Sequence, residues 1–208
     1  TGAQDHFALK AGDAWMGTRL YLYSRPGATN PAAARFAEYA GTAMARDALA
    51  LAGYVSPDIM RVPLAEVRAA VETTGLASGE QTQMALQISQ RFGQWDRLST
   101  TFRGDANSAV AGPEMTRLVA YLQTLPEGSE VAVIGFASGG EGFDVALATS
   151  RAQADAIAQE LAAQVRAAGL RTNIGFAGYG NLVPLACDSD HGADQLNSRV
   201  EIWVRDPN

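Results

Sequence analysis

Beyond about residue 98, the chain alternates between segments with strand spacing and longer segments with helical spacing. Leu98, Thr100 and Phe102 follow the spacing of a strand, and residues 131–137 form an apolar run. Strands that alternate with helices of this length favour a mixed sheet covered by helices on one face. The helical segments carry two apolar stripes, one of Met115, Leu118, Val119, Leu122 and Leu125, and one of Leu147, Ala154, Ala158, Leu161 and Val165.

Two more strands are predicted towards the C-terminus, at residues 173–178 and 200–204, with a long loop between them. Gly169 should end the helix that precedes them. We therefore predict an α/β (α+β) fold, a βαβαβ-β sandwich with about four strands and the Arg151 helix packed on one face. On that helix Arg166 should be exposed, and four residues should be buried: Leu147, Ala154, Leu161 and Val165.

The first part of the chain carries separate strand and helix signals. Residues 19–24 alternate with large apolar and aromatic residues and stop at a Pro-Gly pair, which predicts a strand. A short helix is predicted from residue 63 to about 74. A longer helix should start after Asn30, a good N-cap, and end at Gly53. Its apolar face would consist of Phe36, Ala40, Met44, Ala48 and Leu51.

A polar Gly, Ser and Gln stretch at residues 75–83 is the predicted boundary between two parts. We assign residues 1–80 to a small piece of one strand and two helices, and residues 84–208 to a second domain that opens with a helix. The chain starts at Thr1 without an apolar leader, which we interpret as a processed protein or a fragment.

The composition excludes several classes of partner and cofactor. A net charge of -6 and a pI near 4.9 argue against nucleic acid, because phosphate binding needs a basic surface. Apolar runs are too short for a membrane-spanning helix, which needs about 20 residues. Cys187 is the only cysteine, so neither an internal disulfide nor a Cys/His metal cluster is expected. We predict no cofactor and no metal.

Four short segments of the second domain stand in a fixed order. Gly-Phe-Ala-Ser at 135–138 closes an apolar strand, and Asp-x-x-Leu-Ala-x-x-Arg-Ala at 144–152 opens the long helix. Gly-Tyr-Gly at 178–180 is followed by Pro184, and Asn-Ser-Arg-Val-Glu at 197–201 enters the last strand. No single segment is specific, but the four together form a strong combined pattern.

This pattern resembles the OmpA-like family, whose motifs are Gly-(aromatic or His)-Thr-Asp, Asn-x-x-Leu-Ser-x-x-Arg-Ala and Asn-Arg-Arg-Val-Glu. The resemblance covers about half of the chain. It implies a non-catalytic, periplasmic module of the cell envelope, associated with the outer membrane. The implied partner is peptidoglycan, bound through the diaminopimelate of its stem peptide.

The resemblance also implies a ligand site. Diaminopimelate carries an ammonium and a carboxylate on one side chain, so a selective site needs an acid and an arginine. Arg151 would hold the carboxylate, with N–H groups at the start of its helix directed at the same anion. Asp144 and Asn197 would shape the site, and Arg199 would either add a contact or brace it. A structural alternative pairs Arg151 with a carboxylate on its own helix surface.

Ser138 is the departure from the family pattern, because the family has an aspartate there that grips the ammonium. Losing one charge-assisted hydrogen bond, worth roughly 1.5–3 kcal/mol, lowers affinity about ten- to a hundredfold. Glu141 or Asp144 could replace the missing charge, since the glycine-rich loop after Ser138 should be adaptable. Without such a replacement, Ser138→Asp should raise affinity about tenfold, and Arg151→Ala should remove that gain.

A weaker resemblance links residues 13–57 to the C-terminal end of a periplasmic phosphate-binding protein. It rests on residues 17–23, 31–40 and 53–55. The loops that would cradle a phosphate are not in this sequence. The alternative function is therefore a solute-binding protein for phosphate or another anion, in which the OmpA-like part is only a scaffold.

Two further motifs favour plain structural roles. Ser138 is no nucleophile elbow, because Phe136 stands where that motif needs glycine, and we predict no enzyme. The aspartates of the late loop have plausible calcium spacing, but the sharp-turn glycine and terminal glutamate of an EF-hand are missing. We interpret this group as a solvated loop: Asp188, Asp190 and Asp194.

Overall fold

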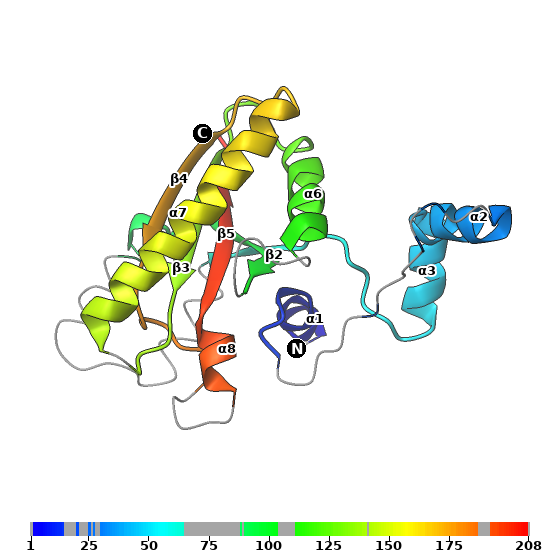
Figure 1. Cartoon of the computed structure of the whole chain (residues 1–208). Helices are drawn as coiled ribbons and strands as arrows, with labels where there is room; N and C mark the ends of the chain where they lie inside the picture. Colours follow the sequence, from blue (N-terminus) through cyan, green and yellow to red (C-terminus); the bar gives the residue numbers. More distant parts are fainter. Residues whose placement is uncertain are drawn as a thin grey trace. The chain divides into compact units, whose positions relative to one another are not determined.

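The structure is a computed structural model that divides into two compact units, Thr1–Asp58 and Ile59–Asn208 (Figure 1). Each unit is described by itself. The predicted boundary at 75–83 lies outside the described residues. The structure describes residues 2–14, 20, 25, 27, 30–64, 88, 90–103, 111–140, 142–186 and 192–207.

The second unit is built on a five-stranded sheet with the order β1-β2-β5-β3-β4. β3 and β4 are parallel, and the other neighbouring pairs are antiparallel. β5 pairs along its whole length with β3, from Arg205 opposite Glu130 to Arg199 opposite Phe136. The last strand in sequence is therefore the central one. The strands are β1 (Arg61–Pro63), β2 (Asp96–Phe102), β3 (Glu130–Phe136), β4 (Asn173–Gly178) and β5 (Arg199–Arg205).

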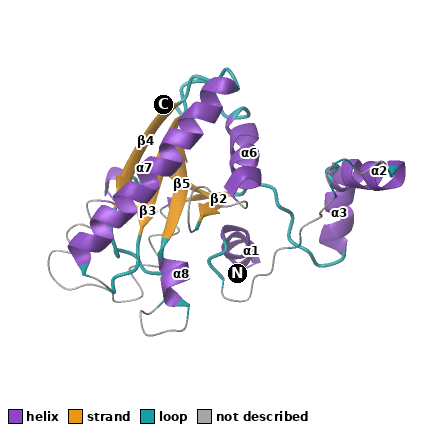
Figure 2. Ribbon diagram, in the orientation of Figure 1, coloured by secondary structure: helices purple, strands orange, loops and turns teal. Residues whose placement is uncertain are grey.

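Two helices cover one face of this sheet (Figure 2). α7 (Phe143–Ala167) packs on β3, β4 and β5, and α6 (Ala111–Leu122) packs on β2 and α7. α7 ends in a Schellman motif, in which the N–H of Leu170 donates to the carbonyl of Val165 at 3.0 Å. Gly169 adopts the φ of 74° that this motif requires. A short helix, α8 (Ala193–Asn197), directly precedes β5.

The core between the helices and the sheet is formed by alternate residues of the strands. Val131 and Val133 of β3 and Ile202 of β5 meet Leu118 of α6 and Leu161 of α7. These five side chains are at most 1% exposed. Burying a side chain of this size stabilises a fold by about 1.5–3 kcal/mol, so this layer holds α6 and α7 on the sheet.

The opposite face of the sheet is also buried, but it contains charges. Glu201 receives hydrogen bonds from Arg199 Nε at 2.7 Å and Trp203 Nε1 at 2.9 Å, and Arg97 Nε lies 3.1 Å from its carboxylate. All four side chains are at most 3% exposed. Phe92 packs edge-on against Trp203, with ring centroids 5.0 Å apart. A buried charge is tolerated only when paired, so this cluster is a specific feature of the face.

The first unit contains three helices among its described residues: α1 (Gly2–Ala11), α2 (Pro31–Ala40) and α3 (Ala43–Leu51). The prediction of one helix from Asn30 to Gly53 is wrong at Gly41 and Thr42, where the chain is interrupted. Thr42 Oγ1 accepts the N–H of Ala45 at 3.2 Å and donates to the carbonyl of Tyr39 at 2.7 Å. It is therefore the N-cap of a new helix.

The predicted apolar face of that helix is largely exposed. Phe36 is 57% exposed, Met44 70% and Leu51 91%. The start of the helix is confirmed, because Asn30 Oδ1 caps α2 by accepting the N–H of Ala32 at 2.9 Å. The strand predicted at 19–24 and most of the helix predicted at 63–74 lie outside the described residues.

The structure confirms the predicted strands in the second unit and the helices α6 and α7. The sheet has five strands instead of about four, because residues 61–63 form β1. Ala154, Leu161 and Val165 are buried and Arg166 is exposed, as predicted, but Leu147 is only half-buried. α8 was missed and lies in the predicted long loop. Among the described helices, none has the length and apolar character needed to cross a membrane.

Candidate functional site

The C-terminal ends of β3 and β4 lie at one edge of the sheet because these two strands are parallel. The segments that follow them stay joined. The N–H of Ala137 donates to the carbonyl of Gly180 at 2.8 Å, and that of Tyr179 donates to the carbonyl of Gly135 at 2.9 Å. β5 runs antiparallel to β3, so α8 and the start of β5 reach the same edge. We call this edge, with Ser138, Arg151, Asp194 and Asn197, the carboxyl-edge site.

Two glycines let α7 lie very close to the sheet at this edge. A Cβ atom on Gly135 would stand 2.0 Å from the backbone oxygen of Ser150, and one on Gly178 would stand 2.3 Å from the backbone nitrogen of Arg151. Ser150 Oγ accepts the N–H of Gly180 at 2.9 Å and donates to the carbonyl of Leu147 at 3.0 Å. These contacts fix the backbone of Arg151 against β4.

Arg151 itself is exposed, and within the described part of the chain it forms no ion pair. The alternative that pairs it with Asp144 or Asp155 is therefore not what the structure has. Asp144 is exposed in the first turn of α7, and Asp155 accepts from Gln159 at 3.0 Å.

The backbone of Arg151 does not lie at the very start of α7. α7 begins at Phe143, so Arg151 stands in its third turn, about 12 Å along the helix axis. The free N–H groups of the first turn are therefore distant from the backbone of Arg151. A joint anion site of these N–H groups and the Arg151 guanidinium stays a prediction.

Ser138 follows β3 and is held by the segment that enters β5. Its N–H donates to Ser198 Oγ at 3.2 Å, and its hydroxyl donates to Asp194 Oδ1. Asp194 is exposed and lies in α8, and its carbonyl accepts the N–H of Ser198 at 2.9 Å. The structure thus places a carboxylate directly on Ser138.

Asn197 lies in α8 as a clamp on the loop after β4. Its Oδ1 accepts the N–H groups of Leu185 at 2.8 Å and Ala186 at 3.0 Å, and its Nδ2 donates to the carbonyl of Ala186 at 3.0 Å. The side chain is 1% exposed. These contacts hold the loop after β4 against the start of β5, and a role of Asn197 in a ligand site stays a prediction.

Arg199 is buried beneath the site and braces it. Its guanidinium carbon lies 4.2 Å from the centre of the Phe136 ring, and its Nη2 donates to the carbonyl of Val183 at 3.0 Å. It is 2% exposed and has Glu201 as an ion-pair partner. Val183 has a φ of 60°, a strained value for a β-branched residue, and Arg199 holds that turn.

Sequence reasoning missed Asp194, which it assigned to a solvated loop. The sequence carries little signal for the contact between Asp194 and Ser138, because that contact depends on β5 lying next to β3 in the sheet. Asn181 was missed as well. Its side chain lies against Gly139, and its Oδ1 is buried with no hydrogen-bond partner among the described residues. Glu141 lies outside the described residues, as do Cys187, Asp188, Asp190 and His191.

The electrostatics of the edge include one perturbed phenol. Burial raises the pKa of Tyr179 above its ordinary value of 10.0, and the positive charge of Arg91 opposes that shift. The ring contacts Phe92 and Phe136, each with centroids 6.3 Å apart. Tyr179 is therefore a neutral packing residue at neutral pH. No group of residues suited to a metal occurs within the described ranges.

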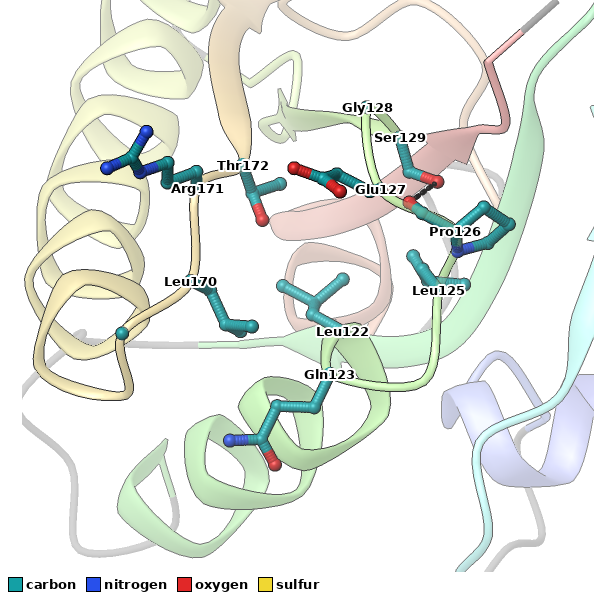
Figure 3. Close-up of a pocket in the computed structure, with 11 residues that line it drawn as sticks. Leu122, Gln123, Leu125, Pro126, Glu127, Gly128, Ser129, Leu170, Arg171 and Thr172 are labelled. Carbon is teal, nitrogen blue, oxygen red and sulfur yellow. Dashed lines mark hydrogen bonds between the residues drawn. The ribbon is translucent and has the colours of Figure 1, made fainter.

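A separate hollow lies at the opposite edge of the sheet (Figure 3). It has a volume of about 380 Å³ and is lined by the end of α6, residues 126–129 and residues 169–172. Figure 3 shows the Arg171 side chain directed away from the leucines that line it. β3 separates this hollow from Ser138 by seven residues, about 23 Å. It is not part of the carboxyl-edge site.

Comparisons with known proteins find similar structures but no matching sequence. No protein-family model and no curated protein matches the chain. The periplasmic domain of Helicobacter pylori MotB is similar over 55% of this chain and 76% of that domain, with 19% identity and a TM-score of 0.45. The cell wall anchor of the T6SS from Pseudomonas aeruginosa is similar over 59% of this chain and 94% of its own, with 19% identity and a TM-score of 0.41.

A third similar structure is the peptidoglycan-associated lipoprotein from Burkholderia pseudomallei. It matches over 51% of this chain and 90% of its own, with 16% identity and a TM-score of 0.44. At these identities and TM-scores the likeness carries nothing about ligands. What this chain binds has to follow from its own residues. The resemblance of residues 13–57 to a phosphate-binding protein stays a prediction.

Proposed function

We propose that the unit Ile59–Asn208 is an OmpA-like, non-catalytic module that associates with peptidoglycan in the periplasmic cell envelope. Its ligand would be the diaminopimelate of the stem peptide, taken at the carboxyl-edge site. Arg151 would bind the ligand's distal carboxylate. Ser138, Asp144, Asn197 and Arg199 would shape or brace the surroundings.

The observation that carries this proposal is the convergence of the sequence motifs on one edge of the sheet. Ser138 and Arg151 are tied to opposite sides of Gly180, because Ala137 donates to its carbonyl and Ser150 accepts its N–H. Arg151, which is exposed and forms no ion pair within the described part of the chain, is thus held at the same edge of the sheet as the exposed carboxylate of Asp194. An acid and an arginine at one edge suit a zwitterionic side chain.

A co-sedimentation assay with purified peptidoglycan sacculi tests the proposal. The intact chain should sediment with sacculi that contain diaminopimelate, and Arg151→Ala should weaken binding about ten- to a hundredfold, since charge-assisted hydrogen bonds are lost. Arg166→Ala is the matched control, because Arg166 is exposed in the last turn of the same helix. Equal binding by Arg151→Ala and Arg166→Ala would contradict the assignment of this site.

The alternative of phosphate or anion binding is separated by thermal stability. A ligand that binds the native state raises the free energy of unfolding by RT ln(1 + [L]/Kd). We expect diaminopimelate to raise the melting temperature of the intact chain and inorganic phosphate to leave it unchanged. A shift with phosphate alone would favour the solute-binding alternative.

A further inference from the structure

We infer that Asp194 supplies the carboxylate that holds the distal ammonium of the ligand, in place of the aspartate that position 138 lacks. This inference rests on the proposed function. The proposed function assigns the ligand's carboxylate to Arg151, and the inference assigns the ligand's ammonium to Asp194. Ser138 then acts as a positioning residue, because its hydroxyl contacts the carboxylate and not the ligand.

The geometry that supports Asp194 consists of two hydrogen bonds between the segment after β3 and the segment of α8, and of one hydrogen bond within the α8 segment. The Ser138 hydroxyl donates to Asp194 Oδ1, the Ser138 N–H donates to Ser198 Oγ, and the Ser198 N–H donates to the Asp194 carbonyl. Both the backbone and the side chain of Asp194 are thereby fixed at the end of β3. Its place depends on α8, which β5 holds next to β3.

The chemistry of this pair leaves a free acceptor. An ionised carboxylate has about four lone-pair positions, and the Ser138 hydroxyl occupies one of them. Because Asp194 is exposed, the remaining positions can accept N–H groups from an ammonium. The family pattern has an aspartate at position 138. This chain has Ser138 hydrogen-bonded to Asp194 instead, so the edge still carries one negative charge.

The other acids near this edge have weaker claims. Asp144 is exposed in the first turn of α7, and the hydrogen bonds of Ser138 go to Ser198 and Asp194 instead. Glu201 is buried and paired with Arg97 and Arg199. Among the described residues, Asp194 is therefore the acid whose carboxylate touches position 138.

The inference reverses one expectation drawn from the sequence. Ser138→Asp would place a second carboxylate against Asp194, and two like charges in contact repel. We therefore expect Ser138→Asp to weaken ligand binding, where the sequence alone predicts a gain. Moving the charge, with Ser138→Asp combined with Asp194→Ser, should restore binding relative to either single variant.

Calorimetry on the intact chain with three synthetic stem tripeptides tests the inference. One ends in meso-diaminopimelate, one in lysine, which lacks the distal carboxylate, and one in 2-aminopimelate, which lacks the distal ammonium. Asp194→Asn should lose about tenfold or more on the first two and little on the third. Arg151→Ala should lose on the first and third and little on the lysine peptide.

Gln195→Ala is the matched control for Asp194→Asn, because Gln195 is an exposed neighbour in α8. Thermal melts confirm that each variant is folded. If the diaminopimelate peptide binds and needs Arg151, while a folded Asp194→Asn binds it as tightly as the parent, the inference is overturned and the proposed function stands. If Ser138→Asp raises the affinity, the inference is overturned as well. If the parent binds none of the peptides, both fail together.

Discussion

At the residue scale, two glycines determine how close the backbone of Arg151 lies to the sheet, because they have no side chains. Gly135 and Gly178 lie where α7 crosses β3 and β4, and their hydrogens face the backbone of Ser150 and Arg151. Neither contact can be relieved by rotating a side chain, because the atoms that would clash include helix backbone. The height of Arg151 above the sheet is thus set by two residues that carry no functional group.

Gly135→Ala should therefore destabilise the protein by about 1–3 kcal/mol or more, since an added methyl has to displace the helix. Gly175→Ala is the matched control in β4. Nothing lies within 4 Å of a Cβ there, and alanine in place of glycine should gain about 0.5 kcal/mol in a strand. Chemical denaturation of both variants measures the difference. Similar midpoints for the two would contradict the proposed close approach.

Tyr179 predicts a stability change at alkaline pH. Because burial raises its pKa above 10.0 in the folded protein, the folded state favours the neutral phenol. This contribution is complete below the unfolded pKa and is lost as the pH rises through the folded one. Tyr179→Phe cannot ionise, so its free energy of unfolding should fall less steeply above pH 10 than that of the parent. Denaturation curves from pH 8 to 11 measure it, and parallel profiles would refute it.

At the element scale, the sequence predicted the elements that are long and periodic. β2 to β5, α6 and α7 each repeat an apolar spacing over several residues. A mixed sheet covered by helices on one face was predicted from them. β1 has three residues and ends in Pro63, so it shows no period. α8 has five residues, too few for a helical stripe.

Two other features were not predicted: the break between α2 and α3, and the contact of Asp194 with Ser138. The apolar stripe continues in phase across Gly41 and Thr42, so periodicity alone joins α2 and α3, while the Thr42 hydroxyl starts a new helix. For the candidate site, the motifs pointed to Ser138, Arg151 and Asn197, which the structure brings to one edge of the sheet. The contact of Asp194 with Ser138 depends on strand order, which a sequence pattern does not encode.

The clamp between α8 and the loop after β4 gives a prediction for an element. Asn197→Ala would leave three polar groups of Leu185 and Ala186 without their partner, at a cost of about 1–3 kcal/mol or more. Hydrogen exchange should accelerate at the amides of Leu185 and Ala186. Gln195→Ala, an exposed change in the same helix, should leave both protected. Unchanged exchange in Asn197→Ala would show that the loop is held by other contacts.

At the scale of the whole molecule, β5 links the two halves of the sheet. It pairs with β2 on one side and β3 on the other, and its residues contribute to the cores on both faces. A chain that ends at Asn197 should therefore lose cooperative unfolding, because without β5 the sheet falls into two separate pairs, β1-β2 and β3-β4. A chain that ends at Asp206 should melt close to the parent. Circular dichroism melts distinguish the two, and a cooperative transition in the shorter chain would contradict this role.

The position of β5 also has a consequence for biosynthesis. The last strand of the domain to leave the ribosome occupies the middle of the sheet, so the domain cannot close until its final strand has been made. Until then the nascent chain has local contacts and two separate strand pairs, β1-β2 and β3-β4, which by themselves are weak. A translocation channel that threads polypeptides in extended form accepts such an open chain. The order of the strands thus postpones folding until the whole domain has been delivered.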